Sequence, residues 1–477
     1  MTESTFTSET PTASQDDVQR LAWGVLLGAF IIFCAILAGS VFTLNYFLFR
    51  STVSGQSFLI VGRGTVGITD ANLIEQVERD RRHILNNQTV RTDAQSQASI
   101  SFMNQQNNNL IVAITVKSNT SLLLDNFSRP RFDWSRAPYN INLKEFSGEL
   151  DVFVVEDIDR RLQLTIETMN NMIIDVSQSG QYRVSASPSQ VRVINRAGNA
   201  IILDPTNPAA SQSVPAGEQI IFQFANPTND PDNATVIEAQ IVQTPALIDL
   251  IENSTFQNTH IPERTQPDEV VQSLPLDWAC GNGANNVPQG KYSVAKIDGR
   301  TALHMVRSEN ASTHGETFCI QAFGTDSQQG FDVSQFDHLS LQATMYVNYQ
   351  SLNACGVEGS ECPLMLRLDY IDANGEPARL FQGFYTTLDP QLGYPLGCSA
   401  ECIQEHQIIN QKAWYTYDSG NLFSILTPEK RPSAILNLRF YASGHQYDVY
   451  VGEVAVLTGN TVDLQPFNNF ADEDDDS

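Results

Sequence analysis

The residues whose types and spacing best suit chemistry are six cysteines in the last part of the chain. An even number of cysteines confined to one region favours local disulfides, and with them an oxidising compartment. Two pairs are separated by short loops, which favours a disulfide within each loop and a third that crosses strands, although the sequence does not select one connectivity. The predicted disulfide cysteines are Cys280, Cys319, Cys355, Cys362, Cys398 and Cys402.

A metal site is the competing interpretation of these cysteines. The segment from Cys398 to Cys402 resembles a metal knuckle or a redox motif, but three residues separate its cysteines, where such motifs have two. None of the seven histidines is paired with another histidine at metal-ligand spacing. We therefore expect no metal ligands and no cofactor, and a zinc site becomes the better interpretation only for a cytoplasmic domain.

Aromatic side chains are concentrated in the same region as the cysteines. Sugars bind by placing their C–H faces on aromatic rings, while flanking Asn, Asp and Gln side chains fix the hydroxyls. The competing interpretation is that the rings fill the core of a β-sandwich, since neighbours such as Trp414 and Tyr415 point to opposite faces of a strand. The candidate ligand-binding residues are Trp278, Tyr385, Tyr394, Trp414 and Tyr417.

Motifs for catalysis are sparse in this sequence. The segment GRGTVG (62–67) lacks the Lys-Ser/Thr and the βαβ context of a phosphate-binding loop, and no G-x-S-x-G nucleophile elbow is present. Carboxylates such as Asp369 and Glu376 offer a pair for glycoside hydrolysis, but acidic residues are common throughout the chain. We therefore expect a protein that is not an enzyme, and an envelope hydrolase is the alternative.

The charge balance limits the kinds of partner. With 28 basic and 54 acidic residues the formal net charge is −26. Such a field repels phosphate backbones, which excludes nucleic acid as a partner, and it suits a soluble ectodomain. Hydrophobic residues make up 42% of the 477 residues, enough for two or three folded domains.

One apolar stretch, residues 21–49, carries no charged residue. It is long enough for a membrane-spanning helix, which needs ~20 apolar residues. Trp23 and the pair Tyr46–Phe47 lie near its two ends, where aromatic side chains favour the membrane interface. A cleaved signal peptide is the alternative, but a polar leader without a basic cluster precedes the stretch. We predict a single-pass transmembrane helix behind a disordered cytoplasmic tail, residues 1–20.

The charges next to this stretch do not orient it. Arg20 precedes it, whereas Arg50 and Arg63 follow it, so the bias of basic residues toward the cytoplasm is uninformative. The clustered cysteines instead favour an extracytoplasmic body. We therefore expect a protein of the cell membrane with its C-terminal body outside.

The body is predicted to be mainly β. From residue 90 to residue 224, short runs rich in β-branched residues alternate with Gly, Pro, Asn and Ser at intervals of ~8–12 residues. One soluble helix is predicted over residues 72–85, where Leu73, Val77 and Ile84 share a helical face and Asn72 with Glu75 resembles a capping box.

Six segments follow one another in the middle of the chain: TVRTDAQSQASISF (89–102), SNTSLLLD (118–125), FSGELDVFV (146–154), QSGQYRVSA (178–186), VRVINRAGNAIIL (191–203) and VPAGEQIIF (214–222). In this order they resemble the FecR domain of single-pass sensors in bacterial envelopes, which relay uptake signals to a sigma factor. The resemblance implies a FecR-like β domain over residues 56–225 and a role in signal transduction. The family's usual Thr-Pro before the Gly-x-Tyr strand is not found here, and we expect the leader to be too short for a cytoplasmic anti-sigma domain.

The last region, residues 274–460, resembles a jelly-roll β-sandwich of the carbohydrate-binding or galactose-binding-like type. Its strand count and its terminal segment YDVYVGEVAVL (447–457) carry this resemblance. Sandwiches of this type often hold a structural calcium ion, which the resemblance implies as an option. A loop and linker (226–273) and an acidic tail (461–477) are predicted on either side.

Two functions therefore follow from the sequence. The first is a non-enzymatic cell-surface protein, in which a FecR-like sensor or stalk carries a β-sandwich that binds a glycan or a protein. The second is a transmembrane signal transducer of the FecR type that regulates a sigma factor. The oligomeric state does not follow from the sequence.

Overall fold

The computed structural model describes residues 15–70, 72–105, 107–203, 211–224, 239–262, 272–284, 287–308, 310–324, 329–398, 402 and 404–462. The chain forms two compact units. The first contains the N-terminal helix and residues 129–138, and the second contains residues 54–128 and everything after residue 138. Of the predicted tails, residues 1–20 and 461–477, the parts 1–14 and 463–477 lie outside the described residues, whereas residues 15–20 belong to the N-terminal helix and are not disordered.

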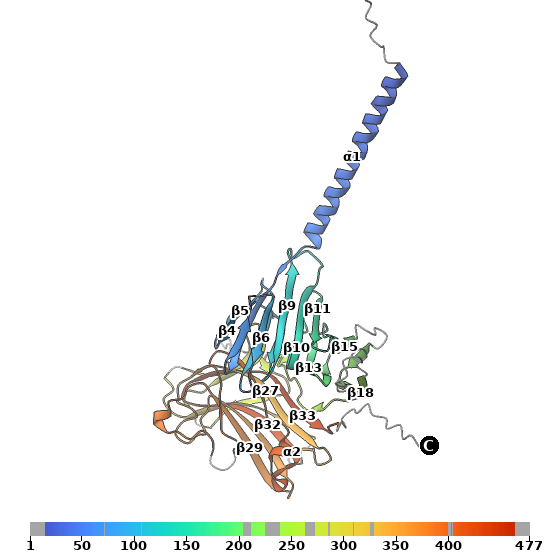
Figure 1. Ribbon diagram of the computed structural model, residues 1–477. Helices are drawn as coiled ribbons and strands as arrows, with labels where there is room; N and C mark the ends of the chain where they lie inside the picture. The colour runs from blue at the N-terminus through green and yellow to red at the C-terminus, as the bar shows by residue number, and fades with distance from the viewer. Residues whose placement is uncertain are drawn as a thin grey trace, which may run out of the picture. The chain divides into compact units, whose positions relative to one another are not determined.

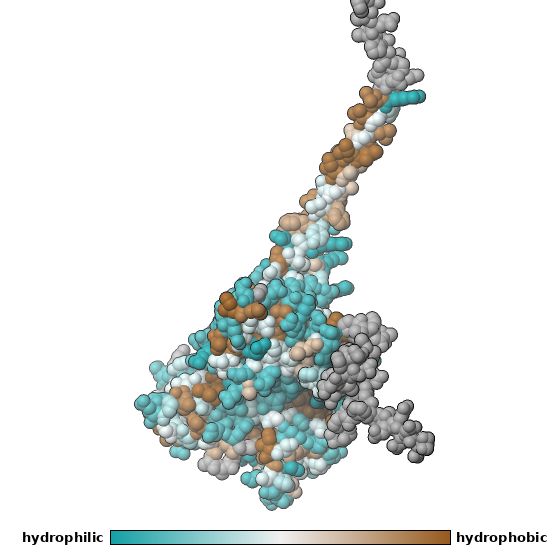
Figure 2. Space-filling model, viewed as in Figure 1, coloured by the Kyte–Doolittle hydropathy of each residue, from teal (hydrophilic) through white to brown (hydrophobic). Residues whose placement is uncertain are grey.

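The N-terminal helix, α1 (Gln15–Phe49), is apolar along most of its length. Its side chains from Leu21 to Phe49 are largely exposed, and Figure 2 shows them as a mostly apolar rod. Within the described part of the chain it is the one helix long and apolar enough to cross a membrane, a test that a signal sequence also passes. It fits the predicted apolar span of residues 21–49.

The middle region, here residues 56–245, consists of two β-sheets that share the long strand β10 (Tyr139–Val154). In sheet 1 the strand order is β4-β3-β6-β9-β10-β11-β12-β15-β16. In sheet 2 it is β5-β2-β7-β8-β10-β13-β14-β17-β18. The first half of β10 pairs in sheet 1 and the second half pairs in sheet 2. Apolar residues from both sheets form one core between them.

The bounds of these strands follow chain order, beginning with the short β1 that precedes them. They are β1 (Thr52–Ser54), β2 (Gln56–Arg63), β3 (Val66–Thr69), β4 (Glu75–Glu78), β5 (Arg82–Ile84), β6 (Gln88–Thr92), β7 (Gln97–Met103), β8 (Leu110–Val116), β9 (Ser121–Pro130), β11 (Leu162–Thr168), β12 (Ile173–Asp175), β13 (Gly180–Ser187), β14 (Gln190–Ala197), β15 (Asn199–Leu203), β16 (Gln212–Pro215), β17 (Glu218–Phe224) and β18 (Ala239–Pro245).

The chain passes from one sheet to the other at sharp bends. Gly148 lies at such a bend within β10 with φ of 108°, and Gly198 lies between β14 and β15 with φ of 98°. Residues with a side chain rarely adopt this left-handed backbone conformation. A Cβ atom at Gly148 would also lie 2.6 Å from the Cα atom of Thr120. Glycine therefore makes possible the continuous path that builds two sheets from one run of chain.

The predicted helix over residues 72–85 is wrong, because strands β4 and β5 occupy this segment. The side chain of Asp70 accepts hydrogen bonds from the backbone N–H groups of Asn72 and Ile74, which forms a turn. β4 then pairs with β3. Leu73 and Val77 are 85% and 68% exposed, so no core holds the face that a helix would need to bury.

The last region is a two-sheet β-sandwich of the jelly-roll type. Sheet 3 has the order β23-β24-β33-β27-β31, with β19 beside β33, and sheet 4 has the order β22-β25-β32-β28-β29-β30, with β26 beside β32. Their facing side chains form a second apolar core. The sandwich prediction is therefore confirmed, and the described part of the chain is mainly β.

The remaining elements belong to this sandwich and its approach. They are β19 (Ile248–Asp249), β20 (Thr259–His260), β21 (Leu274–Pro275), β22 (Ala279–Asn282), β23 (Lys291–Ile297), β24 (Arg300–Arg307), β25 (Gly315–Ala322), β26 (Phe331–Asp332), β27 (His338–Gln350), β28 (Leu364–Asp372), β29 (Pro377–Tyr385), η2 (Pro390–Leu392), β30 (Gln407–Ile408), β31 (Trp414–Asp418), α2 (Leu422–Ile425), η3 (Pro428–Lys430), β32 (Pro432–Gly444) and β33 (Tyr447–Gly459).

The middle region and the sandwich lie next to each other in one compact unit. In Figure 1, β27 and β33 of sheet 3 lie toward the middle region, while β32 and β29 of sheet 4 lie farther away. Every residue of β7 and β8 in sheet 2 is buried. One face of these strands covers the core of the middle region, and the other meets sheet 3.

Candidate binding site

Polar side chains line the junction where sheet 2 of the middle region meets sheet 3 of the sandwich. The side-chain amide of Gln97 in β7 donates to the carbonyl oxygen of Thr416 in β31 at 2.9 Å, and its oxygen accepts from the Thr416 N–H at 2.7 Å. Both residues are buried. Gln97 therefore satisfies the backbone of β31 as a neighbouring strand would.

Two further hydrogen bonds cross the junction from Asn410 to the end of β2. The N–H of Asn410 donates to the carbonyl oxygen of Gly62 at 2.9 Å, and its side chain donates to the carbonyl oxygen of Val61 at 2.9 Å. A Cβ atom at Gly62 would lie 2.4 Å from the carbonyl oxygen of Trp414. Glycine at this position is therefore required for the close approach.

A half-buried charge cluster, the junction cluster, crosses the same surface and contains Lys117, Asp151, Arg183 and Asp418. Arg183 binds Asp151 through two hydrogen bonds of 2.6 and 2.9 Å, and its Nη2 lies 3.3 Å from Asp418 Oδ2. Lys117 Nζ lies 3.1 Å from Asp151 and 3.2 Å from Asp418. Each carboxylate therefore has two cationic partners, which compensate for its partial removal from water.

The junction cluster shifts the pKa values of its carboxyl groups downward. Burial alone would raise the pKa of Asp151, but the charges of Arg183 and Lys117 outweigh burial and hold this pKa below its ordinary range. The pKa of Asp418 is lowered for the same reasons. Both groups are therefore ionised at neutral pH, and their ion pairs hold the middle region and the sandwich together.

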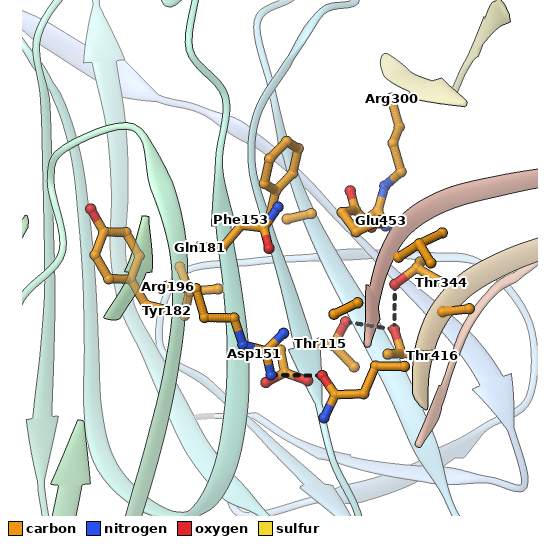
Figure 3. A pocket seen from close by; sticks show the side chains of 16 residues that line it. Thr115, Asp151, Phe153, Gln181, Tyr182, Arg196, Arg300, Thr344, Thr416 and Glu453 are labelled. Atoms are coloured by element: carbon orange, nitrogen blue, oxygen red, sulfur yellow. Dashed lines mark hydrogen bonds and ion pairs between the residues drawn. The ribbon is translucent and has the colours of Figure 1, made fainter. Parts of the chain in front are cut away.

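A small cavity, the junction cavity, lies beside the cluster and has a volume of about 50 Å³. Figure 3 shows Arg196 on one side of it, donating to Gln342 at 2.7 Å, and Thr344 and Thr416 on the other, hydrogen-bonded to each other at 2.9 Å. Arg300 is paired with Glu453 at 2.6 Å at its edge. The volume holds a few water molecules and is too small for a larger ligand.

A larger open cleft, the junction cleft, adjoins this cavity and shares Phe153 and Arg300 with it. Its volume is about 390 Å³, within the ~300–1,000 Å³ range of ligand sites. The lining combines neutral hydrogen-bonding side chains with apolar ones, and Asp157 and Lys296 are its exposed charged groups. It comprises Asn109, Leu110, Phe153, Val155 and Asp157 of the middle region, and Thr255, Gln257, Thr259, Ser273, Val294, Ala295, Lys296, Gly299, Arg300 and Thr301.

Phe153 is the half-buried aromatic ring of the cleft. β10 places it on the face opposite to Leu150, Val152 and Val154, which lie in the core of the middle region. Sequence reasoning passed over this residue, although an aromatic ring on the polar face of an alternating strand was a detectable signal. On the opposite wall, Thr255, Gln257 and Thr259 alternate along the chain and line the cleft together.

The aromatic residues predicted from the sequence lie elsewhere. Trp278 packs between Phe256 and Phe440, and Tyr417 belongs to the same core. Trp414 is 2% exposed at the junction, with the guanidinium of Arg300 4.6 Å from its ring.

Tyr385 and Tyr394 complete this set. Tyr385 is buried against the Cys355–Cys362 loop, and Tyr394 is half-buried. Four of these predicted residues thus fill packed interiors, and none of the five is among the residues that line the junction cleft.

The structure joins all six cysteines of the sandwich in disulfides. Cys280 pairs with Cys319 across β22 and β25, Cys355 pairs with Cys362, and Cys398 pairs with Cys402. The first bond links strands, and the other two close short loops.

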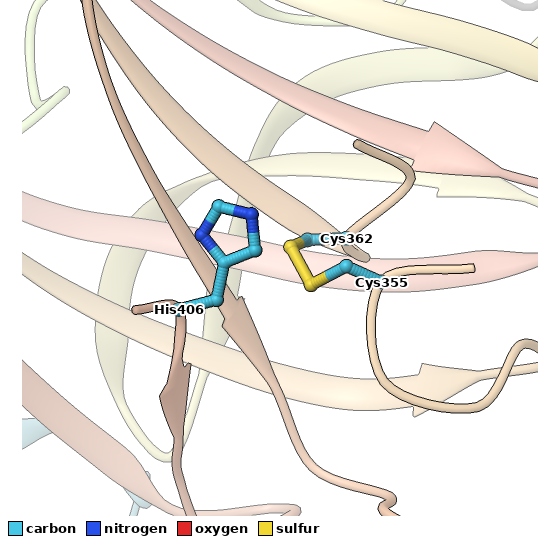
Figure 4. A group of neighbouring side chains, drawn as sticks. All are labelled: Cys355, Cys362 and His406. Atoms are coloured by element: carbon cyan, nitrogen blue, oxygen red, sulfur yellow. A yellow bond between two sulfur atoms is a disulfide. The ribbon is translucent and has the colours of Figure 1, made fainter. Parts of the chain in front are cut away.

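A histidine lies against two of these disulfides. Figure 4 shows His406 beside the Cys355–Cys362 bond, and the Cys398–Cys402 sulfurs also lie within 4.8 Å of it. Its Nδ1 accepts from the Gly383 N–H at 2.9 Å, and its Nε2–H donates to the Gly359 carbonyl oxygen at 2.8 Å. Burial lowers the pKa of His406, which fits this neutral tautomer. Because both pairs are oxidised, their sulfurs are not thiolate ligands here.

Comparisons with known proteins found similarity to solved structures alone. No family model matches the sequence, and no curated protein matches it. A protein from Parabacteroides distasonis described as an anti-sigma factor is 15% identical with a TM-score of 0.22, covering 33% of this chain, which spans 59% of its length. A family 11 carbohydrate-binding module from Clostridium thermocellum is 9% identical, with a TM-score of 0.21, covering 43% of this chain and 99% of the module. A xylan-binding module from Paenibacillus barcinonensis is 11% identical, with a TM-score of 0.21, covering 46% and 98%. At these scores the similarities carry no argument about ligand or partner.

Proposed function

We propose that this protein is a non-enzymatic, membrane-anchored recognition protein that binds a saccharide in the junction cleft. The observation that carries the proposal is the cleft itself, which both β parts line and which surrounds one aromatic ring with neutral hydrogen-bonding groups. A saccharide presents the matching chemistry, because its C–H faces stack on a ring while its hydroxyls pair with amide and hydroxyl side chains.

The character of the lining favours a neutral ligand. Gln257 and Asn109 supply amide groups, and Thr255, Thr259 and Thr301 supply hydroxyls. The guanidinium of Arg300 is already paired with Glu453, so it adds little net charge. The exposed charged groups of the lining, Lys296 and Asp157, have opposite signs, so the cleft carries little net charge and suits a neutral ligand.

The junction gives the cleft fixed walls. The contacts of Gln97 and the junction cluster hold sheet 2 against sheet 3, and a preformed site binds without the cost of ordering its walls. The FecR-like order of segments in the middle region supports an envelope sensor in which ligand binding and the body act as one unit.

The placement in the cell follows from two features. α1 has the length and composition of a span, and the disulfides of the sandwich favour an oxidising compartment. These features support the proposal that the folded body lies on the extracytoplasmic side of the membrane, where saccharides of the envelope are accessible.

The test is a glycan array with the full chain in lipid nanodiscs. Gln257→Ala removes a half-buried amide from the cleft, and Gln391→Ala removes an exposed amide from the short helix η2 of the sandwich. We expect Gln257→Ala to weaken binding about ten-fold, equivalent to one hydrogen bond of ~1.4 kcal/mol, and Gln391→Ala to leave it unchanged. Absence of binding to any glycan, or equal binding by both variants, would refute the proposal.

A further inference from the structure

Residues 129–138, which are the end of β9 and the loop that joins it to β10, pack against the end of α1 within the first compact unit. The ring of Phe132 contacts the ring of Phe47 edge to face, with centroids 5.5 Å apart. The guanidinium carbon of Arg131 lies 5.3 Å from the same Phe47 ring, and the Arg131 N–H donates to the carbonyl oxygen of Ser51 at 3.0 Å. A segment some eighty residues further along the chain therefore binds the end of the anchor.

The loop also caps the helix. The last carbonyl groups of a helix have no partner within it. The hydroxyl of Ser135, which is buried, donates to the carbonyl oxygen of Phe49 at 2.6 Å. The position of the loop on the helix is thus set by a specific hydrogen bond as well as by ring packing.

The outer surface of this unit combines aromatic rings with basic groups. Trp134 is 61% exposed, although its ring stacks on Phe132 at 4.8 Å. Arg131 and Arg136 are also exposed, as is Asp133, and residues 129–138 together carry three arginines and one aspartate. In a chain with a net charge of −26, basic groups beside an exposed tryptophan form a surface of opposite character to the rest of the molecule.

We propose that residues 129–138 form a second membrane contact, in which Trp134 lies in the interfacial region of the bilayer and Arg131 and Arg136 bind phospholipid phosphate groups. This inference rests on the proposed role of α1 as a membrane span. Tryptophan is enriched at the membrane–water interface because its ring is apolar and its N–H is polar, and guanidinium groups bind phosphate through paired hydrogen bonds. Since phospholipids of both leaflets carry phosphate, the contact does not depend on the side of the membrane.

The test uses quenching of tryptophan fluorescence by brominated phospholipids, with the full chain reconstituted in vesicles. Trp278 and Trp414 are buried in the second unit, so Trp23 of α1 and Trp134 are the exposed tryptophans of the described residues. The Trp134→Phe variant reports on the helix through Trp23, and the Trp23→Phe variant reports on the loop through Trp134. We expect both variants to be quenched by lipids brominated near the headgroup end of the acyl chain, with at least half of the accessible signal lost.

The arginine contacts are tested in the Trp23→Phe background. Arg131→Gln together with Arg136→Gln is expected to reduce Trp134 quenching by at least half, whereas Lys291→Gln on an exposed strand position of the sandwich is expected to leave it unchanged. If Trp23 is quenched and Trp134 is not, the loop proposal is wrong while anchoring stands. If neither tryptophan is quenched, the anchor itself fails.

Discussion

Replacing Gln97 with leucine tests whether the hydrogen bonds between the middle region and the sandwich stabilise the folded chain. Gln97 satisfies both backbone groups of Thr416 in a buried setting. Leucine has a similar volume but neither donor nor acceptor. The variant therefore leaves one N–H and one C=O without a partner, and each such group costs ~1–3 kcal/mol. We expect the free energy of unfolding to fall by about 2–5 kcal/mol.

The measurement is urea denaturation of the full chain in detergent, followed by tryptophan fluorescence. With a urea dependence of roughly 3 kcal/mol per molar, the expected loss lowers the midpoint by about 1 M. Trp414 precedes Thr416 by two residues and is 2% exposed at the junction, so its emission shifts to longer wavelength when the two sheets separate. In the Gln97→Leu variant we therefore expect this emission shift at a lower urea concentration than in the unmodified chain.

Gln95→Leu is the matched control, because it makes the same chemical change at an exposed position two residues away. It is expected to shift the midpoint by less than ~0.2 M, since exposed substitutions usually change stability by under ~0.5 kcal/mol. Equal midpoints for the two variants would show that Thr416 finds other partners and that the junction does not depend on Gln97.

Three further changes probe other parts of the second unit. Gly62→Ala places a methyl group against the carbonyl oxygen of Trp414, and we expect ~1–3 kcal/mol of destabilisation with a fluorescence shift in native conditions. Replacing both Cys280 and Cys319 with alanine opens a 39-residue loop, with an expected loss of about 4 kcal/mol in urea denaturation. The lowered pKa of His406 means that its contribution to stability is present above pH ~6.5 and is lost as the pH falls through the folded-state value. His406→Gln should remove that part of the pH dependence of the melting temperature.

Each of these has a control within the sandwich. Gly397→Ala meets only ordinary contacts and should be neutral. Loss of the Cys398–Cys402 bond opens a loop of four residues and should cost about 2 kcal/mol, roughly half of the larger loop. His314→Gln is the matched substitution at a side chain that is 55% exposed and contacts Glu361, and it should change the melting profile less than His406→Gln. If a control variant has a larger effect than the variant it is paired with, the structural explanation given for that pair is wrong.

The strand alternation of the middle region predicted the sheets, but it could not reveal what covers their second face. In β10 the residues Leu150, Val152 and Val154 alternate with Glu149, Asp151 and Phe153, a pattern typical of a sheet with one solvent face. The polar face is instead paired with sheet 3 through ion pairs between opposite charges, in which Lys117 and Arg183 join Asp151 to Asp418. Local periodicity predicts which residues share a face of a strand. It does not predict that this face pairs with a segment more than two hundred residues away.

The predicted helix over residues 72–85 failed for a related reason. Apolar residues at helical spacing indicate a helix only where a core can bury them, and Leu73 and Val77 are exposed. The pairing of β3 with β4 and the turn at Asp70 instead provide hydrogen bonds for the backbone of this segment. Tertiary pairing thus outweighed a short amphipathic pattern.

The same burial decides where a ligand can bind. On sheet 3 the rings of Trp414 and Tyr346 stand beside Thr344 and Gln342, which is the combination that a sugar platform needs. The middle region already occupies that face, and the contacts of Gln97 and Asp418 hold it there. A ligand would have to break those contacts to reach Trp414, whereas the junction cleft is open without any rearrangement. For the saccharide proposed above, the cleft therefore avoids the cost of breaking the junction, whereas new sugar binding by a Gln97→Leu chain would show that the covered face binds once it is open.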